Sequence, residues 1–387
     1  MSQVKEAVAH GIKSMPRRWA GMLVAIIGLA GVTAVLVAML SLAHGFKSAL
    51  NTGVSAQNAV VLRTSSSSEL DSFLARAELD ALATAVTSIS ADAVVSGELY
   101  TVIDISRERR GAAMNVPLRG VNANASRVRG GYRITQGREY RSGHKELIAG
   151  EGLANRFPNA GIGSNIRIGN EEWVIVGLFE ADARPVAGEL WGDLPMVQSA
   201  SARPNGYSVV YVRIGDAIDQ LKAIVKDNPL LPVRVVDEPS FFAEQSGMLS
   251  GFIAGFGYIV AVLMAVGAGF GAVNTMYAAV ASRSREFATM RAIGFSRRSL
   301  FFSVVVEGTL IALAGAALGC LVSFLVFNGY TVSTINVATF SQVYFDFAVS
   351  ASVMAQATSF CLLVGLVGSI LPAFRAGFLP IAAALRE

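Results

Sequence analysis

The sequence predicts an α-helical membrane protein with four transmembrane helices and an α+β domain, outside the cytoplasm, inserted between the first and second helix. Four long apolar stretches occur, each long enough to cross a hydrocarbon layer roughly 30 Å thick. Apolar residues make up 53% of the 387 residues and charged residues only 16%, which is unusual for a soluble protein. The region between the first two stretches has instead the mixed composition of an ordinary folded domain.

The four predicted spans are residues 19–43, 247–281, 300–327 and 347–374. Only the third contains a charged residue, Glu307. A cleaved signal peptide is the alternative for the first span, but this stretch is about twice the usual apolar length of 7–15 residues. We therefore expect four spans that stay in the membrane.

Lysine and arginine predict the orientation of the spans, because cytoplasmic flanks are enriched in them. They lie before the first span, between the second and third, and after the fourth: Lys5, Lys13, Arg17, Arg18, Arg283, Arg285, Arg291, Arg297, Arg298, Arg375 and Arg386. The loop 328–346 has neither residue type. We expect segments 1–18, 282–299 and 375–387 to be cytoplasmic, residues 44–246 and 328–346 to lie outside, and the chain to reside in the cytoplasmic (inner) membrane.

The outer domain is expected to be a split βαβ fold with a small, mostly β insert at about residues 130–197. The first half combines a strand at 58–64, a helix that starts at Ser68 and runs to about residue 85, and strands at 93–105 and 116–121. The insert has a strand at 146–149, a helix at 151–157 and a hairpin of 165–168 with 173–179. The second half has a strand at 207–214, a helix at 217–225 and a strand at 233–236. Residues 43–57 and 238–246 are expected to extend the first two spans as a helical stalk.

No residue pattern predicts catalysis, a metal site or a cofactor site. Ser142, His144 and Glu146 are close in sequence, but closeness in sequence is not triad geometry. The two cysteines, Cys320 and Cys361, both lie inside spans, so no disulfide framework is expected. The net charge of +4 does not indicate nucleic-acid binding, because the basic residues flank membrane spans.

Three glycines of the second span, Gly247, Gly251 and Gly255, recur every four residues. Such a stripe allows two helix backbones to approach closely, so we expect helix packing there. The alternative is that glycine is simply common in membrane helices.

The densest positive cluster lies in residues 282–299, between the second and third spans. Phe287, Met290 and Ile293 are three residues apart, which predicts a short amphipathic helix along the membrane surface. Gly294 is well placed to end this helix and Ser296 to cap the next. The pattern leaves open whether the helix rests on anionic lipid headgroups or docks in a cleft of a cytoplasmic partner.

Residues 274–300 strongly resemble the signature of ABC-transporter permeases of the MacB/FtsX type. The matching positions are Asn274, Arg283, Arg285, Glu286, Arg291, Ala292 and Gly294. Further matches are Glu307-Gly308 with Gly315 and Gly319, and a C-terminal pattern at Pro372, Ala373, Arg375, Ala376, Pro380, Ala384, Leu385 and Arg386. The outer domain resembles the MacB-type periplasmic core at Gly137-Arg138, Gly163, residues 173–176 and Gly177. The resemblance covers essentially the whole chain.

The resemblance implies a permease without enzymatic activity that works with a separate ATPase, which binds ATP and Mg. No Gly-x-x-x-x-Gly-Lys-Ser/Thr phosphate-binding loop occurs in this sequence, and only about 18 residues precede the first span, unlike relatives with a fused ATPase. The residues expected to couple to the ATPase are Arg283, Arg285, Glu286, Phe287, Met290, Arg291 and Gly294. Expected partners also include a second permease, as a homodimer, membrane lipids and a periplasmic adaptor or membrane-fusion protein.

The implied function is mechanotransmission: ATP hydrolysis moves the outer domain, which exports or extracts a drug, peptide, lipid or lipoprotein. The alternative is an FtsX-like signalling permease that regulates an extracytoplasmic cell-wall hydrolase. The large outer domain with its β-rich insert favours the exporter.

Asn274 and Glu307 are the intramembrane polar residues of interest. An acid inside a span is a functional hypothesis by default, since burying it is costly. The alternatives for Glu307 are snorkelling to Arg297 or Arg298, or a hydrogen bond within the bundle.

Overall fold

The computed structural model describes residues 2–14, 19–106, 113–129, 132–155, 157–181, 186–229, 231–335 and 342–378. The chain forms two compact units. The helical unit comprises Met1–His44, Gly251–Tyr330 and Asp346–Glu387. The sheet unit comprises Gly45–Ser250 and Thr331–Phe345. The expected residues Pro380, Ala384, Leu385 and Arg386 lie outside the described part of the chain.

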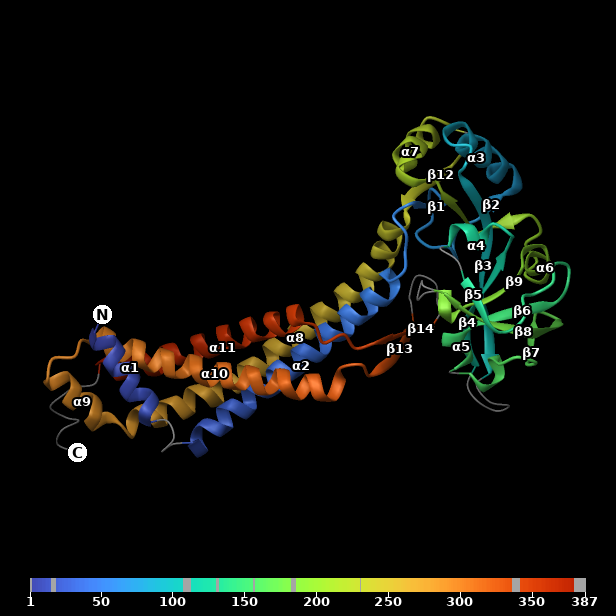
Figure 1. The fold of residues 1–387 in the computed structure, drawn as a ribbon. Coiled ribbons are helices and arrows are strands. Elements are labelled where there is room, and N and C mark those ends of the chain that lie inside the picture. The colour runs from blue at the N-terminus through green and yellow to red at the C-terminus, as the bar shows by residue number, and fades with distance from the viewer. Residues whose placement is uncertain are drawn as a thin grey trace. The chain divides into compact units, whose positions relative to one another are not determined.

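The long helices of the chain carry the four apolar stretches (Figure 1). The helices are α1 (Ser2–Ser14), α2 (Trp19–Asn51), α8 (Glu238–Ala281), α9 (Ser284–Ala292), α10 (Arg297–Phe327) and α11 (Ala351–Phe378). Within the described residues, α2, α8, α10 and α11 are long and apolar enough to cross a membrane, which confirms the four predicted spans. Helix α2 continues to Asn51 and α8 begins at Glu238, so both extend beyond their apolar stretches, as expected.

Close packing in the helical unit depends on small residues of α10. An added Cβ at Gly315 would lie 2.8 Å from Leu29 Cβ, and one at Gly319 would lie 2.6 Å from the Ala30 carbonyl oxygen. Only glycine therefore allows α10 to approach the backbone of α2 this closely. The side chains of Leu29 and Ala316 fill the adjoining core.

The stripe of Gly247, Gly251 and Gly255 does not make such a contact within the described chain. An added Cβ at any of the three would meet no atom within 4 Å. The stripe therefore meets no described residue of this chain, and the expected helix packing there stays a prediction. Helices α2 and α8 approach instead at Gly257, where a Cβ would lie 2.5 Å from Met39 Cβ.

The sheet unit consists of strands with short helices between them. The strands are β1 (Asn58–Arg63), β2 (Leu74–Ala75), β3 (Val94–Ser106), β4 (Ala113–Val121), β5 (Tyr132–Gly137), β6 (Glu146–Gly150), β7 (Asn165–Ile168), β8 (Glu171–Ala181), β9 (Leu190–Asp193), β10 (Gly206–Tyr207), β11 (Val209–Arg213) and β12 (Val233–Asp237). The helices are α3 (Arg76–Ile89), α4 (Ala125–Val128), α5 (Glu151–Ala154), α6 (Leu194–Ala200) and α7 (Ile218–Lys226). A separate two-stranded sheet pairs β13 (Thr331–Ile335) with β14 (Gln342–Asp346).

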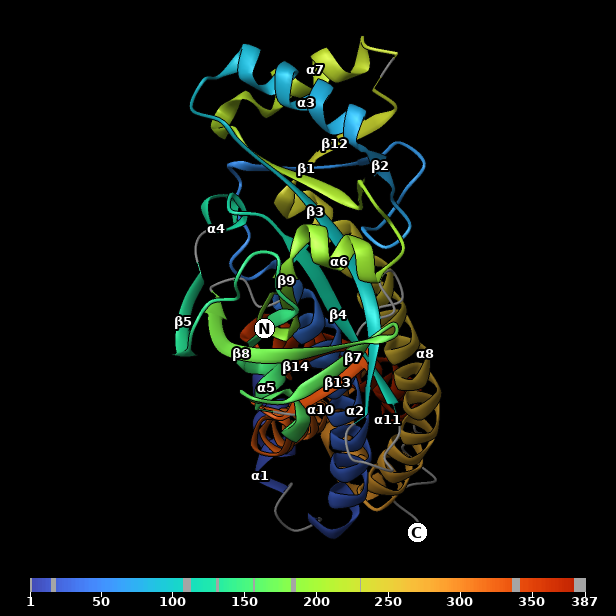
Figure 2. The ribbon, with the colours of Figure 1, turned by 90° about the vertical axis from the view of Figure 1, so that its right-hand side faces the viewer.

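The order β12-β1-β11-β3 confirms the split βαβ fold. Strands β1 and β3 are both antiparallel to β11, which lies between them, so they are parallel to each other. Strands β11 and β12 flank β1 in the same way. Helices α3 and α7 lie side by side on one face (Figure 2), where Leu82 and Leu221 enter the core. The opposite face is covered by Phe241 and Phe242 from the first turns of α8.

The β-rich insert extends the same sheet. Strand β3 pairs with β11 from Val94 to Glu98 and with β4 from Leu99 to Ser106. The sheet then continues in the order β4-β9-β6-β8-β5, with β7 on β8. The expected hairpin of β7 and β8 is present, and Gly169 in its turn has a φ of +60°, which favours glycine.

The helix expected to start at Ser68 begins eight residues later, at Arg76. The carboxylate of Asp71 accepts hydrogen bonds from the backbone N–H of Ser67 and Ser68, at 3.2 and 2.9 Å, so this segment is a turn. Glu78 caps the true start of α3, since its carboxylate accepts the Ala75 N–H at 2.8 Å. The expectation failed because serine and aspartate stabilise turns as readily as helix starts.

A buried charge network, which the sequence did not indicate, lies where β3 changes partners. The Arg119 guanidinium donates to the carboxylates of Glu69, Glu98 and Glu189, with nitrogen–oxygen distances of 2.9, 3.1 and 2.8 Å. Arg129 also donates to Glu98, at 2.9 Å. All five side chains are buried. Burial alone would raise the pKa of Glu69, but the attraction and hydrogen bonds of Arg119 outweigh it and lower the pKa.

The Arg119→Met variant should destabilise the sheet unit by about 3–5 kcal/mol. Three buried carboxylates would then share one guanidinium, that of Arg129, in place of two. Denaturant unfolding followed by the fluorescence of buried Trp173 and Trp191 reports on this unit. The matched control is Arg133→Met, whose partner Glu180 is exposed, and it should cost about 1 kcal/mol or less. Equal losses for the two variants would contradict a structural role of the network.

Gly319→Val should destabilise the helical unit by roughly 1–3 kcal/mol, since its side chain would overlap the backbone of α2. Thermal unfolding of the full chain in dilute detergent measures this effect. Gly251→Val is the matched control, because its side chain meets open space within the chain. A loss for Gly251→Val as large as that for Gly319→Val would show that the stripe packs against this chain after all.

Candidate functional site

Helix α9 is a short helix whose end is fixed by a glycine. Gly294 has a φ of +103°, in the left-handed region that favours glycine. The N–H of Phe295 donates to the carbonyl of Met290 at 3.0 Å, which closes the last turn. The Ser296 hydroxyl accepts the N–H of Ser299 at 3.2 Å and so caps α10. Both expected end signals are confirmed.

Arg283, directly before α9, is the buried centre of this region. Its guanidinium lies 2.8 Å from Glu286 and 3.4 Å from Glu307, and it stacks over the Phe287 ring at 4.9 Å. Arg283 is 4% exposed and Glu307 is 6% exposed. The partner of the intramembrane acid is therefore Arg283 rather than Arg297 or Arg298, because Arg283 reaches Glu307 inside the bundle and no snorkelling is needed.

Two of the three residues of the predicted apolar face, Phe287 and Met290, pack within the helical unit. Phe287 and Ala288 are buried, and Met290 is half-buried against the same cluster. That cluster joins α9 to α8, α10 and α11 through Met276, Val280, Leu300, Val304, Ala373 and Ala376. Ile293, expected on the same face, is 71% exposed. It is the residue that caps the C-terminal end of α9 and lies beyond the regular turns, so its direction departs from the helical period.

The other expected residues lie around this core. Arg291 donates to the carbonyl of Gly377 in α11 at 2.8 Å. Arg285 is exposed. Asn274 is also exposed, on α8. The structure thus brings Arg283, Glu286 and Glu307 together and leaves Arg285 and Asn274 on the surface.

Helix α1 belongs to the same site, which the sequence analysis missed. The hydroxyls of Ser299 and Ser303 in α10 donate to the α1 carbonyls of Gln3 and Ala7, at 2.8 and 2.9 Å. His10 lies 3.6 Å from Glu286. The spacing of Val4, Ala7, Val8 and Gly11 is the signal that predicts this helix, because it forms one apolar face.

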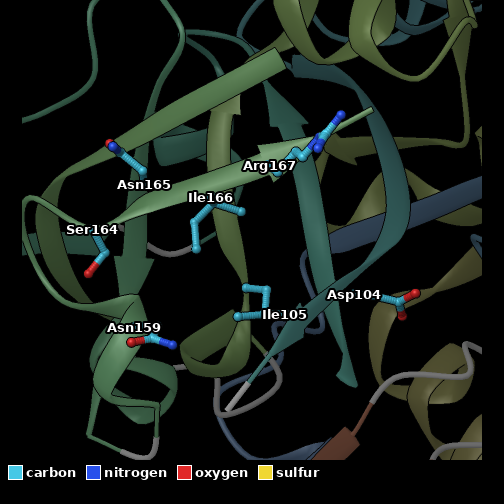
Figure 3. A pocket seen from close by; sticks show the side chains of 7 residues that line it. All are labelled: Asp104, Ile105, Asn159, Ser164, Asn165, Ile166 and Arg167. Atoms are coloured by element: carbon cyan, nitrogen blue, oxygen red, sulfur yellow. The ribbon is translucent and has the colours of Figure 1, made fainter. Parts of the chain in front are cut away.

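A separate hollow of about 380 Å³ lies in the sheet unit, at the end of β3 (Figure 3). The buried side chains of Ile105 and Ile166 form part of its lining. Polar side chains complete the lining: Asp104, Asn159, Ser164, Asn165 and Arg167. Such a mixed lining with one carboxylate and one guanidinium suits a small polar or zwitterionic group.

Helix α9 is buried on one face and exposed on the other. Within the described residues, no group of three or more His, Cys, Asp or Glu could hold a metal ion. One face of α9 is fixed to α8, α10 and α11 by Phe287, and Arg283 adds an ion pair to α10. The other face exposes Arg285 and Thr289. Helix α9 is thus in contact with three of the four candidate spans.

Two family matches cover most of the chain. The MacB-like periplasmic core domain matches residues 22–228, which is more than half of the chain. The FtsX-like permease C-terminal region matches residues 258–381.

Curated relatives agree with these matches. The macrolide export ATP-binding/permease protein MacB of Hahella chejuensis (strain KCTC 2396) is 26% identical over 333 residues, which is 80% of this chain and 49% of that protein. The protein of the same name from Bordetella avium (strain 197N) is 31% identical over 130 residues, covering 33% of this chain and 19% of that protein. The chain spans about half the length of the Hahella relative.

Two solved structures are similar to part of the chain. The periplasmic region of MacB from Actinobacillus actinomycetemcomitans has a TM-score of 0.36 and 12% identity, covering 49% of this chain and 92% of that chain. The extracellular domain of the noncanonic ABC-type transporter YknZ from Gram-positive bacteria has a TM-score of 0.34 and 14% identity, covering 46% of this chain and 99% of that chain.

Arg283→Met should destabilise the helical unit by about 3–5 kcal/mol, because it removes the guanidinium that pairs with the buried Glu307 carboxylate. The double variant Arg283→Met/Glu307→Gln should lose less than the sum of the two single variants, with a coupling of roughly 0.5–3 kcal/mol. Thermal unfolding of the full chain in detergent measures all three. Strict additivity would show that the pair does not fix this end of the bundle.

Proposed function

Because the chain belongs to the family of ABC permeases that combine a MacB-like periplasmic core domain with an FtsX-like C-terminal region, we propose that it couples ATP hydrolysis to movement of its outer domain. ATP and Mg bind to a separate ATPase subunit. That subunit seats on the exposed face of α9. The movement exports or extracts a substrate such as a drug, peptide, lipid or lipoprotein outside the cytoplasmic membrane.

The observation that carries this proposal is the two-sided character of α9. Its inner face is fixed by Phe287 and by the Arg283–Glu307 pair, so it cannot swing freely. Its outer face exposes the Arg285 guanidinium and the apolar Ile293 side chain. A rigid helix with an exposed face of mixed chemistry is what a partner needs in order to push on the spans.

The continuity of α8 supports transmission along the chain. This 44-residue helix contributes Glu238–Ser250 to the sheet unit and the rest to the helical unit. At its first residue, the Glu238 carboxylate accepts hydrogen bonds from the Asn58 side chain at 2.8 Å and the Ser55 N–H at 3.1 Å. Just beyond its last residue, Arg283 makes the ion pairs described above. Both ends of α8 are thus held by buried polar contacts.

The proposed assembly contains two copies of this chain, membrane lipids and a periplasmic adaptor or membrane-fusion protein. The exposed glycine stripe of α8 offers a surface for the second copy, since an added Cβ there would meet no atom of the described residues within 4 Å. The proposed orientation places both termini and α9 in the cytoplasm, and it follows from the positions of lysine and arginine.

The test uses the ATPase that co-purifies with the tagged full chain in mild detergent, reconstituted with it in membranes. Arg285→Glu should reduce the permease-stimulated ATP turnover roughly tenfold, within the usual range of coupling free energies. Glu286→Lys and Arg291→Glu should abolish the stimulation, because they also break the contacts to Arg283 and Gly377. Membrane insertion should remain intact in all three variants.

Arg133→Glu is the control, because it is an equal charge reversal at an exposed position on β5. Its ATP turnover should equal that of the unmodified chain. If the Arg285→Glu variant still binds the ATPase and the ATP turnover is unchanged, the coupling role of α9 is contradicted.

A further inference from the structure

A groove between the start of α10 and the end of α11 lies beside the coupling site. It has a volume of about 490 Å³. Its lining combines two cations with aromatic rings: Arg297, Arg298, Phe301, Phe302, Ala373, Phe374, Gly377 and Phe378. All of these residues belong to the helical unit. The motif that identifies the family does not explain the aromatic lining.

The two arginines carry positive charge that no carboxylate of the described residues balances. Arg297 stacks over the Phe378 ring at 5.0 Å, and both arginines are exposed. They occupy the first two positions of α10, where the helix dipole is positive and cations are unfavourable. Arg283 differs, since it is paired with two carboxylates. The groove therefore has a positive end that favours an anion.

The rest of the groove is apolar and open. Phe302 is 49% exposed, Phe374 50% and Phe378 61%. The rings of Phe301 and Phe374 pack edge to face with centroids 5.1 Å apart, which fixes the wall. Ala373 and Gly377 are buried small residues of the lining, so they place no large side chain in the groove. A ligand that fits has a negative head and an apolar tail.

The position of the groove relative to the membrane selects the ligand. The arginines directly precede residues 299–306, an uncharged stretch of a membrane-spanning helix, so they lie at headgroup level. Arginine binds phosphate through two parallel N–H donors. Free phosphate would leave the aromatic wall uncovered, whereas a phospholipid covers it with an acyl chain.

We propose that this groove binds one anionic phospholipid, with its phosphate at Arg297 and Arg298 and an acyl chain along Phe302 and Phe374. The site also lies next to the anchor of α9, because the Gly377 carbonyl that accepts Arg291 belongs to the groove lining. The inference requires the spans to lie in a membrane, and it is independent of any ATPase partner.

Native mass spectrometry of the detergent-purified full chain, titrated with phosphatidylglycerol or phosphatidylcholine, tests the proposal. Phosphatidylglycerol should bind more tightly than phosphatidylcholine at one site per chain. Arg297→Gln/Arg298→Gln should weaken the binding of phosphatidylglycerol roughly tenfold or more, and Arg297→Lys/Arg298→Lys should retain most of it. Phe302→Ser should weaken both lipids, because it removes part of the apolar wall.

The matched control is Arg285→Gln/Arg375→Gln, which removes two exposed charges outside the groove lining. It should leave the binding of phosphatidylglycerol within about twofold of the unmodified chain. If this control loses as much phosphatidylglycerol binding as Arg297→Gln/Arg298→Gln, the binding reflects general electrostatic attraction, and the proposal is overturned. Displacement of the lipid by millimolar inorganic phosphate would overturn it as well, since the site would then bind a free anion.

Discussion

The buried ion pair between Arg283 and Glu307 is the interaction on which this end of the helical unit depends. A carboxylate inside a span is costly unless a cation meets it, and the only chain segment that supplies one here among the described residues is the turn between α8 and α9. Once Arg283 is drawn inward, Glu286 and Phe287 follow it, because all three belong to the same turn. The pair therefore sets which face of α9 is buried and which is exposed.

The sheet unit also pairs buried carboxylates with arginines, and more side chains take part. Arg119 and Arg129 face Glu69, Glu98 and Glu189, so three negative charges meet two positive ones. Neutral donors complete the network: the Tyr211 hydroxyl donates to Glu69 at 2.8 Å and the Trp191 N–H to Glu189 at 2.7 Å. Each donor comes from a different strand or loop, so a shift in strand register would leave a buried charge unpaired. The network thus fixes the register at the point where β3 leaves the split βαβ half and enters the insert.

The sequence alone predicts the features that depend on composition or on the periodicity of apolar residues. The four spans follow from the length of apolar stretches, and β7–β8 follows from alternation around a glycine turn. The sequence does not predict features that depend on contacts between residues far apart in the chain. Nothing in the sequence distinguishes Arg283 from Arg297 as the partner of Glu307, since both arginines flank a span. The stripe of Gly247, Gly251 and Gly255 has the same spacing as Gly315 and Gly319, yet only the latter pair meets another helix of this chain.

The exposed position of Ile293 follows from the way in which α9 ends. The apolar period of α9 predicts one shared face of Phe287, Met290 and Ile293, but the regular turns end at Ala292 and the chain then reverses at Gly294. That reversal leaves Ile293 71% exposed, on the same helix as the exposed Arg285 guanidinium. Ile293 is not part of the buried cluster that holds Phe287 and Met290 among the described residues. In the proposed contact with an ATPase subunit, this side chain would supply apolar area beside the charge of Arg285.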